Sequence, residues 1–250
     1  MFQKKIENIL QKYNYEFFHT KTTKSTMLDV RNYLKDYKEN CFYLSDQQSE
    51  GKGQRGSNWY SPPGNIYCSV SFDNFLDIKE HFLFSVLISL SIKMSLEKFN
   101  AKNIYFKWPN DIFYKKNKFA GMISEIIDTN ENKSHIIVGF GINFISAPQL
   151  KKYDATYIKS FCNLKSINEF LLVFIKILFS NLQVLKKGKK NKLMEVFSKS
   201  LMFIDKKVNI VFSNSSSKNG IFRGVNDDGS LKLETKYKIE NIYKGSIKLC

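Results

Sequence analysis

The chain has 250 residues, enough for one large domain or for a large and a small one. Hydrophobic residues make up 43% of it and aromatic residues 15%, which excludes global disorder and allows a substantial core. The formal net charge is +16. This charge fits a nucleic-acid-binding protein or a lysine-rich surface around a site for anionic substrates. A compositional bias of the whole proteome would also explain it without any function.

The cysteines and histidines predict neither a metal centre nor thiol chemistry. None of the four cysteines forms a Cys-x-x-Cys pair, and the three histidines lie far apart in the sequence. Scattered free thiols suit a reducing compartment. The first residues lack the apolar core of a signal peptide, and the apolar runs at 82–92 and 170–179 are shorter than the roughly 20 residues that span a bilayer. We therefore expect a cytoplasmic protein without a membrane partner.

The first half of the chain predicts short strands separated by helices. Apolar residues from Leu28 to Leu34 follow helical spacing, and Ser25 or Thr26 is a natural N-cap for this helix. Alternating apolar residues predict a half-buried strand before a helix that is apolar nearly all round. The predicted elements are helices at 1–12, 26–37 and 78–99 and strands at 15–20, 41–44 and 65–72.

The second half predicts a run of strands, then helices, then short strands again. Pro109 cannot donate to a sheet ladder and ends its strand, and Lys115-Lys116-Asn117 and Asp227-Asp228-Gly229 are hairpin-type turns. The predicted strands are 104–106, 112–114, 118–127, 135–144, 208–212, 220–225, 231–233 and 242–249, and the helices are 166–187 and 191–201.

This order of elements predicts an α+β fold, with a mixed, largely antiparallel sheet packed with helices. We expect a catalytic domain at 1–204 and a small C-terminal β module at 205–250. The module is small for an independent domain, so it should lean on the larger one.

The segment Gln48–Trp59 is the first candidate binding element. Its glycines allow a sharply turned backbone whose N–H groups approach a ligand closely, and such N–H groups beside cationic side chains form a concave anion site. A solvated surface loop explains the same residues, and this segment alone does not decide between the two. The residues concerned are Gly51, Lys52, Gly53, Gln54, Arg55, Gly56 and Trp59.

Hydroxyl groups and glycines supply two further candidates. Ser25 and Thr26 could serve only as helix caps, or they could present donors and acceptors to a ligand at the helix N-terminus. Gly139 and Gly141 alternate along a buried strand. They therefore share one face and allow a ligand or another backbone to come close.

A polar cluster follows the strand at 104–106. Asn110 and Asp111 could hold a hydroxyl, an ammonium group or hydrated Mg²⁺, an ion usually held by few carboxylates plus substrate phosphates. A simple turn explains the same residues. Lys118 begins a mostly apolar strand, where it is either a charge that protects a sheet edge or a fixed cation that faces the site.

Taken together, the glycine loop, Lys118 and a magnesium ion suit nucleotidyl transfer to a carboxylate. The attacking carboxylate is already ionised at neutral pH and the leaving group is pyrophosphate, so the site needs cations rather than a general base. The scarcity of histidine agrees with this, and no Ser-His-Asp or Cys-His pattern is visible.

These segments resemble the motifs of the biotin–protein ligases, also called biotin–acetyl-CoA-carboxylase ligases. The loop is similar to the family's Gly-Arg-Gly-Arg-x-Gly-x-x-Trp, and Lys107–Asp111 is identical with its Lys-Trp-Pro-Asn-Asp. The resemblance covers about residues 14–145 well and the C-terminal module more loosely. Further matches in the right order are Lys118-Phe119-Ala120-Gly121, Gly139-Phe140-Gly141-Ile142-Asn143, Ser25-Thr26 and Gln48.

The resemblance implies a class II synthetase-like catalytic domain and an SH3-like C-terminal β-barrel. It implies a ligase that converts biotin and Mg-ATP into biotinyl-5′-AMP and pyrophosphate. The enzyme would then transfer biotin to a lysine of the biotin carboxyl carrier protein of acetyl-CoA carboxylase. ATP and Mg²⁺ would be co-substrate and metal. We expect no DNA partner, and either a monomer or a homodimer.

The same resemblance implies roles for individual residues. Catalytic roles fall to Lys118, Arg55 and Asp111, and Asp111 would also be the magnesium ligand. Biotin contacts are expected from Ser25, Thr26, Met27, Gln48, Gly51, Lys52, Gly53, Gln54 and Lys118. Nucleotide contacts are expected from Lys52, Gln54, Arg55, Trp59, Lys107, Asn110 and Asn143.

Three substitutions depart from the family pattern. Lys52 and Gln54 replace two loop arginines, and a neutral amide cannot replace a guanidinium on a phosphate. We hypothesise that Arg55, one residue on, supplies the missing charge. Met27 stands where the family usually has Asn, which removes one polar contact with biotin.

Two other functions fit parts of the sequence. A lipoate–protein ligase would have a similar fold, although the intact Lys107–Asp111 motif favours biotin. A nucleic-acid-binding regulator is supported only by the charge of +16. Regulators of this family carry an N-terminal winged-helix domain, and we expect none because the catalytic pattern starts by residue 15.

Overall fold

A seven-stranded, mostly antiparallel sheet forms the centre of the computed structural model, which describes residues 2–129, 133–149 and 154–250. Only the β1–β2 pair is parallel. The side chains of Arg55, Thr129 and Lys133 lie outside the description. In sheet order the strands are β1 (Glu16–Thr20), β2 (Cys41–Ser45), β3 (Ile66–Asp73), β7 (Lys133–Ile142), β6 (Asn117–Thr129), β5 (Asp111–Tyr114) and β4 (Ile104–Lys107).

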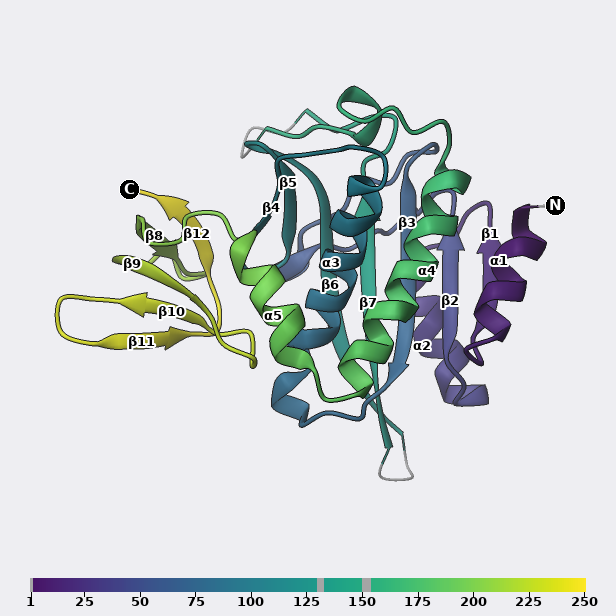
Figure 1. The fold of residues 1–250 in the computed structure, drawn as a ribbon, viewed down its shortest axis with the longest axis horizontal. Helices are drawn as coiled ribbons and strands as arrows, with labels where there is room; N and C mark the ends of the chain where they lie inside the picture. Colours follow the sequence, from purple (N-terminus) through teal and green to yellow (C-terminus); the bar gives the residue numbers. More distant parts are fainter. Residues whose placement is uncertain (1, 130–132, 150–153) are drawn as a thin grey trace.

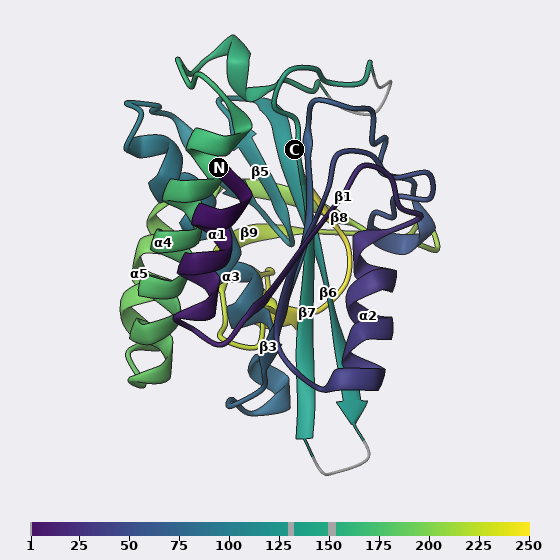
Figure 2. The same ribbon diagram turned by 90° about the vertical axis from the view of Figure 1, so that its right-hand side faces the viewer.

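Helices cover the two faces of this sheet unequally (Figures 1 and 2). Four helices lie on one face: α1 (Phe2–Gln11), α3 (Phe82–Glu97), α4 (Ile167–Lys186) and α5 (Lys190–Lys199). The other face carries α2 (Thr26–Tyr37), which packs on β2, β3 and β7. Three short 3₁₀ turns complete the described helical elements: η1 (Gln54–Gly56), η2 (Ile78–Glu80) and η3 (Ile158–Ser160).

Strand alternation divides the core between the two faces. Val138, Phe140 and Ile142 of β7 belong to the large core cluster under the four helices, where the Phe140 and Phe174 rings lie 5.4 Å apart. Ile137 instead joins a small cluster under α2. Successive side chains of a strand point to opposite faces, so the same strand fills the large core and leaves its other face for α2 and the space beside it.

Helix α4 extends beyond the apolar run seen in the sequence. Its 20 residues, Ile167–Lys186, are long and apolar enough to cross a membrane by length and composition alone. The apolar run at 170–179 was expected to be too short to span a bilayer, but the helix that contains it reaches the necessary length. However, α4 packs against α1, α3 and α5, and Phe170, Phe174 and Leu178 on it are fully buried. The helix has the packing of a core helix, which passes the same test.

A second sheet of five strands follows α5 and has the order β11-β10-β9-β8-β12. The expected strand at 242–249 is wrong, because the chain bends at Gly245, where φ is +147°. A Cβ at this glycine would lie 2.6 Å from Ile210. The bend sends β12 to β8, at the opposite edge from β11. The strands are β8 (Lys207–Val211), β9 (Ser217–Val225), β10 (Leu231–Glu234), β11 (Ile239–Ile242) and β12 (Ser246–Leu249).

Candidate active site

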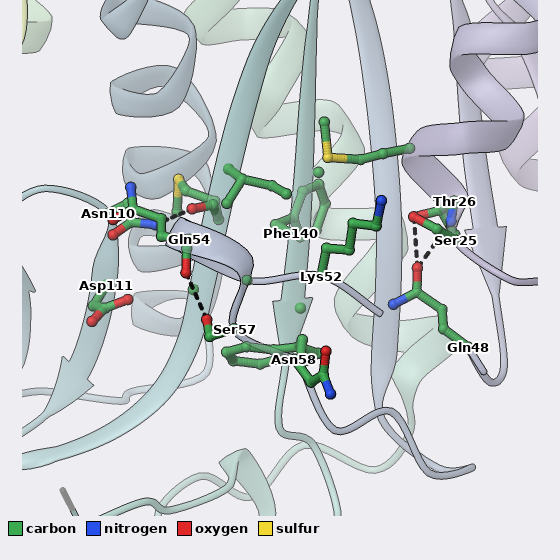
Figure 3. Close-up of a pocket in the computed structure, with 18 of the residues that line it drawn as sticks. Ser25, Thr26, Gln48, Lys52, Gln54, Ser57, Asn58, Asn110, Asp111 and Phe140 are labelled. Carbon is green, nitrogen blue, oxygen red and sulfur yellow. Dashed lines mark hydrogen bonds between the residues drawn. The ribbon is translucent and has the colours of Figure 1, made fainter. Parts of the chain in front are cut away.

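A cavity of about 630 Å³ opens on the α2 face of the central sheet. Residues from the start of α2, the glycine loop, β5, β6, β7 and β12 meet in it (Figure 3). The lining residues are Ser25, Thr26, Met27, Gln48, Lys52, Gly53, Gln54, Ser57, Asn58, Trp59, Asn110, Asp111, Lys118, Gly121, Met122, Ile123, Gly139, Phe140, Gly141 and Ser246.

Three glycines make the floor of the cavity. Gly121 and Gly141 are paired across β6 and β7, and Gly139 lies two residues before Gly141 on the same face. A Cβ on Gly141 would lie 2.2 Å from the indole nitrogen of Trp59, and one on Gly139 would lie 2.5 Å from Met27. The sequence predicted that Gly139 and Gly141 share one face and allow a ligand or another backbone to come close; what comes close in the structure is the side chains of Met27 and Trp59.

The end of the cavity near α2 is a network of hydroxyls and one amide. The Gln48 side-chain oxygen accepts from the Thr26 backbone N–H at 2.9 Å and from the Thr26 hydroxyl at 3.2 Å. The Thr26 and Ser69 hydroxyl oxygens lie 2.7 Å apart, and the Gln48 amide donates to Ser61 at 3.1 Å. Buried polar groups need such partners, so the network fixes the rotamers at this end.

The expected capping role of Ser25 and Thr26 was therefore only half right. Ser25 is the N-cap residue of α2, but its side chain makes no capping hydrogen bond. The amide oxygen of Gln48, from the loop, accepts from the first turn instead. Figure 3 shows Ser25, Thr26 and Gln48 grouped together on one side of the cavity. The Ser25 hydroxyl is therefore not used as a helix cap, and Ser25 is one of the residues that line the cavity.

The glycine loop forms a small hairpin over the cavity. Lys52 and Asn58 make a β-bridge, the Gly53 N–H donates to the Ser57 carbonyl at 2.7 Å, and the Trp59 N–H donates to the Gly51 carbonyl at 2.8 Å. The 3₁₀ turn η1 closes the tip. These backbone hydrogen bonds hold the loop together although it has no large apolar core of its own. The loop is therefore a lid that is stabilised by a short β-hairpin.

Trp59 seals the hairpin against the floor. Its indole lies on the bare backbone of Gly141 and near Gly121, and the Lys118 ammonium is 5.2 Å from its ring centroid. The indole N–H is buried and has no hydrogen-bond partner among the described atoms. A buried donor without a partner costs about 1–3 kcal/mol. A ligand acceptor placed here would relieve that cost.

The far end of the cavity is charged. The Lys118 ammonium lies 2.6 Å from the Asp111 carboxylate, and the two side chains are 11% and 26% exposed. The Lys118 backbone is fixed on both sides, because its N–H donates to Asp154 and its carbonyl accepts from Thr156. Figure 3 places Asn110 and Asp111 on the side of the cavity opposite Ser25 and Gln48. The site thus has a hydroxyl–amide end and a charged end.

Two residues expected to bind the nucleotide do not line the cavity. Asn143 is buried, and its amide donates to the Thr156 carbonyl at 3.1 Å, so it holds a loop in place. The Lys107 ammonium lies 5.4 Å from the Phe113 ring and 5.9 Å from the Phe203 ring. Burial among these groups lowers the pKa of Lys107.

Two loop residues complete the account of the expected site. Gly51 is not in the lining, and it is close-packed instead: a Cβ there would lie 2.6 Å from both the Ser61 hydroxyl and the Trp59 carbonyl. Arg55 lies within η1, but its side chain is outside the part that the structure describes. The other expected biotin and nucleotide residues come together in one cavity.

Several lining residues were missed from the sequence. Met122, Ile123 and Phe140 neighbour the motif glycines on β6 and β7, and strand alternation alone could have found Ile123 as a partner of Gly139. Ser57 and Asn58 lie inside the loop motif. Ser246 comes from the second sheet, and no local signal marks it.

Comparison with known proteins gives a consistent family. Residues 18–143 match the model of the biotin/lipoate A/B protein ligase family. The bifunctional ligase/repressor BirA of Escherichia coli (strain K12) is 26% identical over 211 residues, which cover 82% of this chain and 65% of that protein. The biotin–[acetyl-CoA-carboxylase] ligase of Paracoccus denitrificans is 25% identical over 128 residues, or 50% of this chain and 53% of that one. The chain thus spans less than two thirds of these relatives.

Solved structures share the fold. The biotin protein ligase of Aquifex aeolicus in complex with biotin and ATP superimposes with a TM-score of 0.75 at 23% identity, covering 94% of this chain and 98% of that one. The Leishmania major biotin protein ligase in complex with biotinyl-5-AMP gives a TM-score of 0.63 at 20% identity, covering 92% and 98%. The match includes the second sheet, since it extends over nearly the whole chain.

Proposed function

Because the chain belongs to the biotin/lipoate A/B protein ligase family, we propose that it is a biotin–protein ligase. It would activate biotin with ATP to biotinyl-5′-AMP, with release of pyrophosphate. It would then transfer biotin to a lysine of the biotin carboxyl carrier protein of acetyl-CoA carboxylase. Two sequence relatives are named biotin–[acetyl-CoA-carboxylase] ligase and biotin–protein ligase, and these names favour biotin over lipoate as the acid.

One observation carries the proposal: a single cavity gathers the motif residues of five separate chain segments. Ser25–Thr26, Gln48–Trp59, Asn110–Asp111, Lys118–Gly121 and Gly139–Gly141 are far apart in sequence but share one lining. A solvated loop or a simple turn, the alternatives at each segment, would not require the others to meet. The cavity is also of the size of a small-ligand site, roughly 300–1,000 Å³.

The hydroxyl–amide end supports a role in holding the ureido ring of biotin. A cyclic urea has two N–H donors and one carbonyl acceptor, and each needs a partner when buried. Ser25, Thr26 and Ser69 hydroxyls can accept and donate. Since the Gln48 oxygen already accepts twice from Thr26, we assign Gln48 to holding Thr26 in position. Met27, packed on Gly139, would make an apolar wall.

The charged end supports a role in nucleotidyl transfer. The Lys118 ammonium, held near Asp111 and beside the Trp59 ring, would face the biotin carboxylate and the α-phosphate as negative charge builds on the oxygens. Fixed cations aimed at developing charge commonly contribute 10²–10³ in rate. The unpaired Trp59 N–H would donate to the bound adenylate, and its ring would pack near the adenine.

The donor set at this end fits magnesium carried in with ATP. No group of three or more His, Cys, Asp or Glu side chains in the described chain could hold a metal by itself. Mg²⁺ usually takes one or two carboxylates plus substrate phosphates, so Asp111 would be its protein ligand, and Asn110 lines the same cavity. When bound, the ion would neutralise charge on the triphosphate.

The loop hairpin supports protection of the intermediate. An acyl adenylate is a reactive mixed anhydride, and a site that excludes water limits its hydrolysis. With Trp59 on Gly141 and the Gly53–Ser57 bond closing the tip, the loop would cover the adenylate until the carrier lysine attacks. The lysine nitrogen forms the amide bond to the biotin carbonyl carbon, AMP leaves with the electron pair of the broken bond, and the proton of the amine is lost to solvent.

We also propose the division of labour and the setting expected from the sequence. The catalytic domain would comprise residues 1–204 and the C-terminal module residues 205–250, which is supported by the separation of the strands into two sheets. The enzyme would work in the cytoplasm, without DNA or membrane partners, as a monomer or a homodimer.

The test is to incubate the protein with Mg-ATP and either biotin or lipoate and to follow pyrophosphate release. We expect release with biotin and not with lipoate. A carrier domain should then become biotinylated, and its variant with the acceptor lysine changed to arginine should not. Release with lipoate alone would replace biotin by lipoate in the proposal, and release with neither acid would overturn it.

A further inference from the structure

We propose that Trp108 is a positioning residue that ties the charged end of the cavity to the C-terminal β module, which contributes Ser246 to the cavity lining. The inference rests on the proposed function in one respect, the identification of the charged end of the cavity as the end that binds the nucleotide. Trp108 itself does not line the cavity. It is 3% exposed and stands two and three residues before Asn110 and Asp111, which do line it.

The first contact is a hydrogen bond between the two sheets. The Trp108 indole N–H donates to the Gly229 carbonyl at 2.8 Å. Gly229 lies in the turn between β9 and β10, where φ is +81°. Tryptophan has one N–H donor and no acceptor, so this bond uses the whole polar capacity of the side chain. The only polar group of the indole is therefore held by the module.

The second contact places Ser246. A Cβ at Gly245 would lie 3.7 Å from the Trp108 ring, which is ordinary van der Waals contact. Gly245 is the bend between β11 and β12, and the next residue, Ser246, lines the cavity. The same indole thus bonds to the turn before β10 and lies beside the bend before β12. Moving the indole would move both the Asn110–Asp111 segment and the chain that carries Ser246.

The module turn is itself held against the helices. Lys190 of α5 lies 3.0 Å from the Asp227 carboxylate and also pairs with Glu80. A Cβ on Gly229 would lie 2.6 Å from Phe82, so the turn packs tightly on the start of α3. A docked turn is a fixed acceptor for the indole, whereas a loose one would not orient it.

On the side of the cavity, hydrogen bonds join the segment that follows Trp108 to strand β6. The Asn110 amide donates to the Met122 carbonyl, and the Met122 N–H donates to the Asn110 carbonyl at 3.1 Å. These bonds join the residue after Pro109 to the β6 strand that forms the floor. An anchored Trp108 therefore limits how Asn110 and Asp111 can move relative to Lys118, with which Asp111 pairs.

The experiment compares Trp108→Phe and Ser246→Ala with two matched controls. Trp108→Phe keeps a ring but removes the N–H. Tyr105→Phe, on the strand β4 that leads into Trp108 but outside the cavity lining, removes a hydroxyl from a nearby aromatic ring. Ser217→Ala, in the module but outside the lining, controls for loss of a serine hydroxyl. Calorimetry would give the Kd of each protein for Mg-ATP and for biotin, and thermal unfolding would report the fold.

We expect Trp108→Phe and Ser246→Ala to weaken ATP binding roughly fivefold to tenfold, as the loss of one hydrogen bond does. Biotin affinity should change less than twofold, and both controls should match the wild type. Equal losses for ATP and biotin, or no loss for either variant, would overturn the inference. If Trp108→Phe folds poorly, the Ser246→Ala variant still tests the inference.

A ligand-free measurement separates this inference from the proposed function. Amide hydrogen exchange at Met122, whose N–H donates to Asn110, should quicken in Trp108→Phe and stay unchanged in Tyr105→Phe. If the wild type binds no ATP but Met122 exchange quickens, the proposed function fails and the positioning role stands. Unchanged exchange at Met122 would overturn the positioning role whatever the enzyme does.

Discussion

The two faces of the central sheet differ in what they are made of. The face under α1, α3, α4 and α5 is a continuous apolar core with several fully buried phenylalanines. The α2 face has only a small apolar cluster of five residues, and beside it lie Gly121, Gly139, Gly141 and the buried hydroxyl of Ser69. Both faces are built from the same strands, because successive residues of a strand point to opposite faces of the sheet.

This difference separates stability from function within a single sheet. Burial of aliphatic and aromatic side chains on the helical face supplies most of the favourable free energy of folding. The α2 face has glycines instead of such side chains, and Met27 and Trp59 pack on them beside the cavity. Substitutions on the first face should therefore change unfolding, and substitutions on the second should change binding and catalysis.

The largest expected effect is on the helical face. Phe174→Ala removes a fully buried ring that lies 5.4 Å from Phe140 and 5.7 Å from Phe170. It should lower the free energy of unfolding by about 3–5 kcal/mol, measured by urea denaturation. The folded fraction should bind biotin with unchanged Kd. A weakened Kd without loss of stability would break the comparison between the two faces.

Lys118→Ala should come next and act on the other face. Removing the cation paired with Asp111 should slow pyrophosphate release roughly 10²–10³-fold, followed in a steady-state assay. Stability should change little. Lys116→Ala, in the exposed turn before β6, is the matched control and should be fully active. An unaffected Lys118→Ala enzyme contradicts the assignment of this end.

Gly141→Ala tests the bare floor directly. The new Cβ would lie 2.2 Å from the Trp59 indole nitrogen, so the lid could not seat, and such overpacking costs about 1–3 kcal/mol. We expect faster release of biotinyl-5′-AMP into solution, measured by trapping the free adenylate. In a Trp59→Ala background the added effect should vanish. If it persists there, the clash with the indole is not the cause.

The smallest effect separates two neighbouring loop residues. Arg55→Ala should weaken retention of the adenylate more than Gln54→Ala, because a charge-assisted hydrogen bond contributes about 1.5–3 kcal/mol and a neutral one about 0.5–1.5. The released-adenylate assay gives both numbers. Gln54 lines the cavity. Equal or reversed effects on retention of the adenylate would contradict the proposed role of Arg55.

Much of the fold could be predicted because its signals are local. Helical spacing places α2, strand alternation places β3, and hairpin turns join β5 to β6 and β9 to β10. The residues Ser25, Gln48, Asp111 and Lys118 were also found, through the motifs that resemble the ligase family, and each stands near the end of an element or in a loop. At such positions side chains are free of the sheet interior and can face a ligand.

Direction in space was less predictable than position in the chain. Asn143 belongs to the same short motif as Gly141, yet it does not line the cavity and its amide donates to the Thr156 carbonyl. Gln48 lines the cavity as expected, and its side-chain oxygen accepts from Thr26, which its place in the sequence did not indicate. Sequence spacing says which face a strand residue occupies, but not which of several polar partners satisfies it.

By itself the sequence determined the α+β class, the order of the elements and the glycine floor, because these follow from periodicity and from residues that lack a Cβ. Only the tertiary structure decided that a bend at Gly245 splits the last strand and that Ser246 reaches the cavity. The same holds for the bond from Trp108 to a turn 121 residues away. The physical reason is that these contacts join two sheets, and their geometry depends on how the sheets pack rather than on any local pattern.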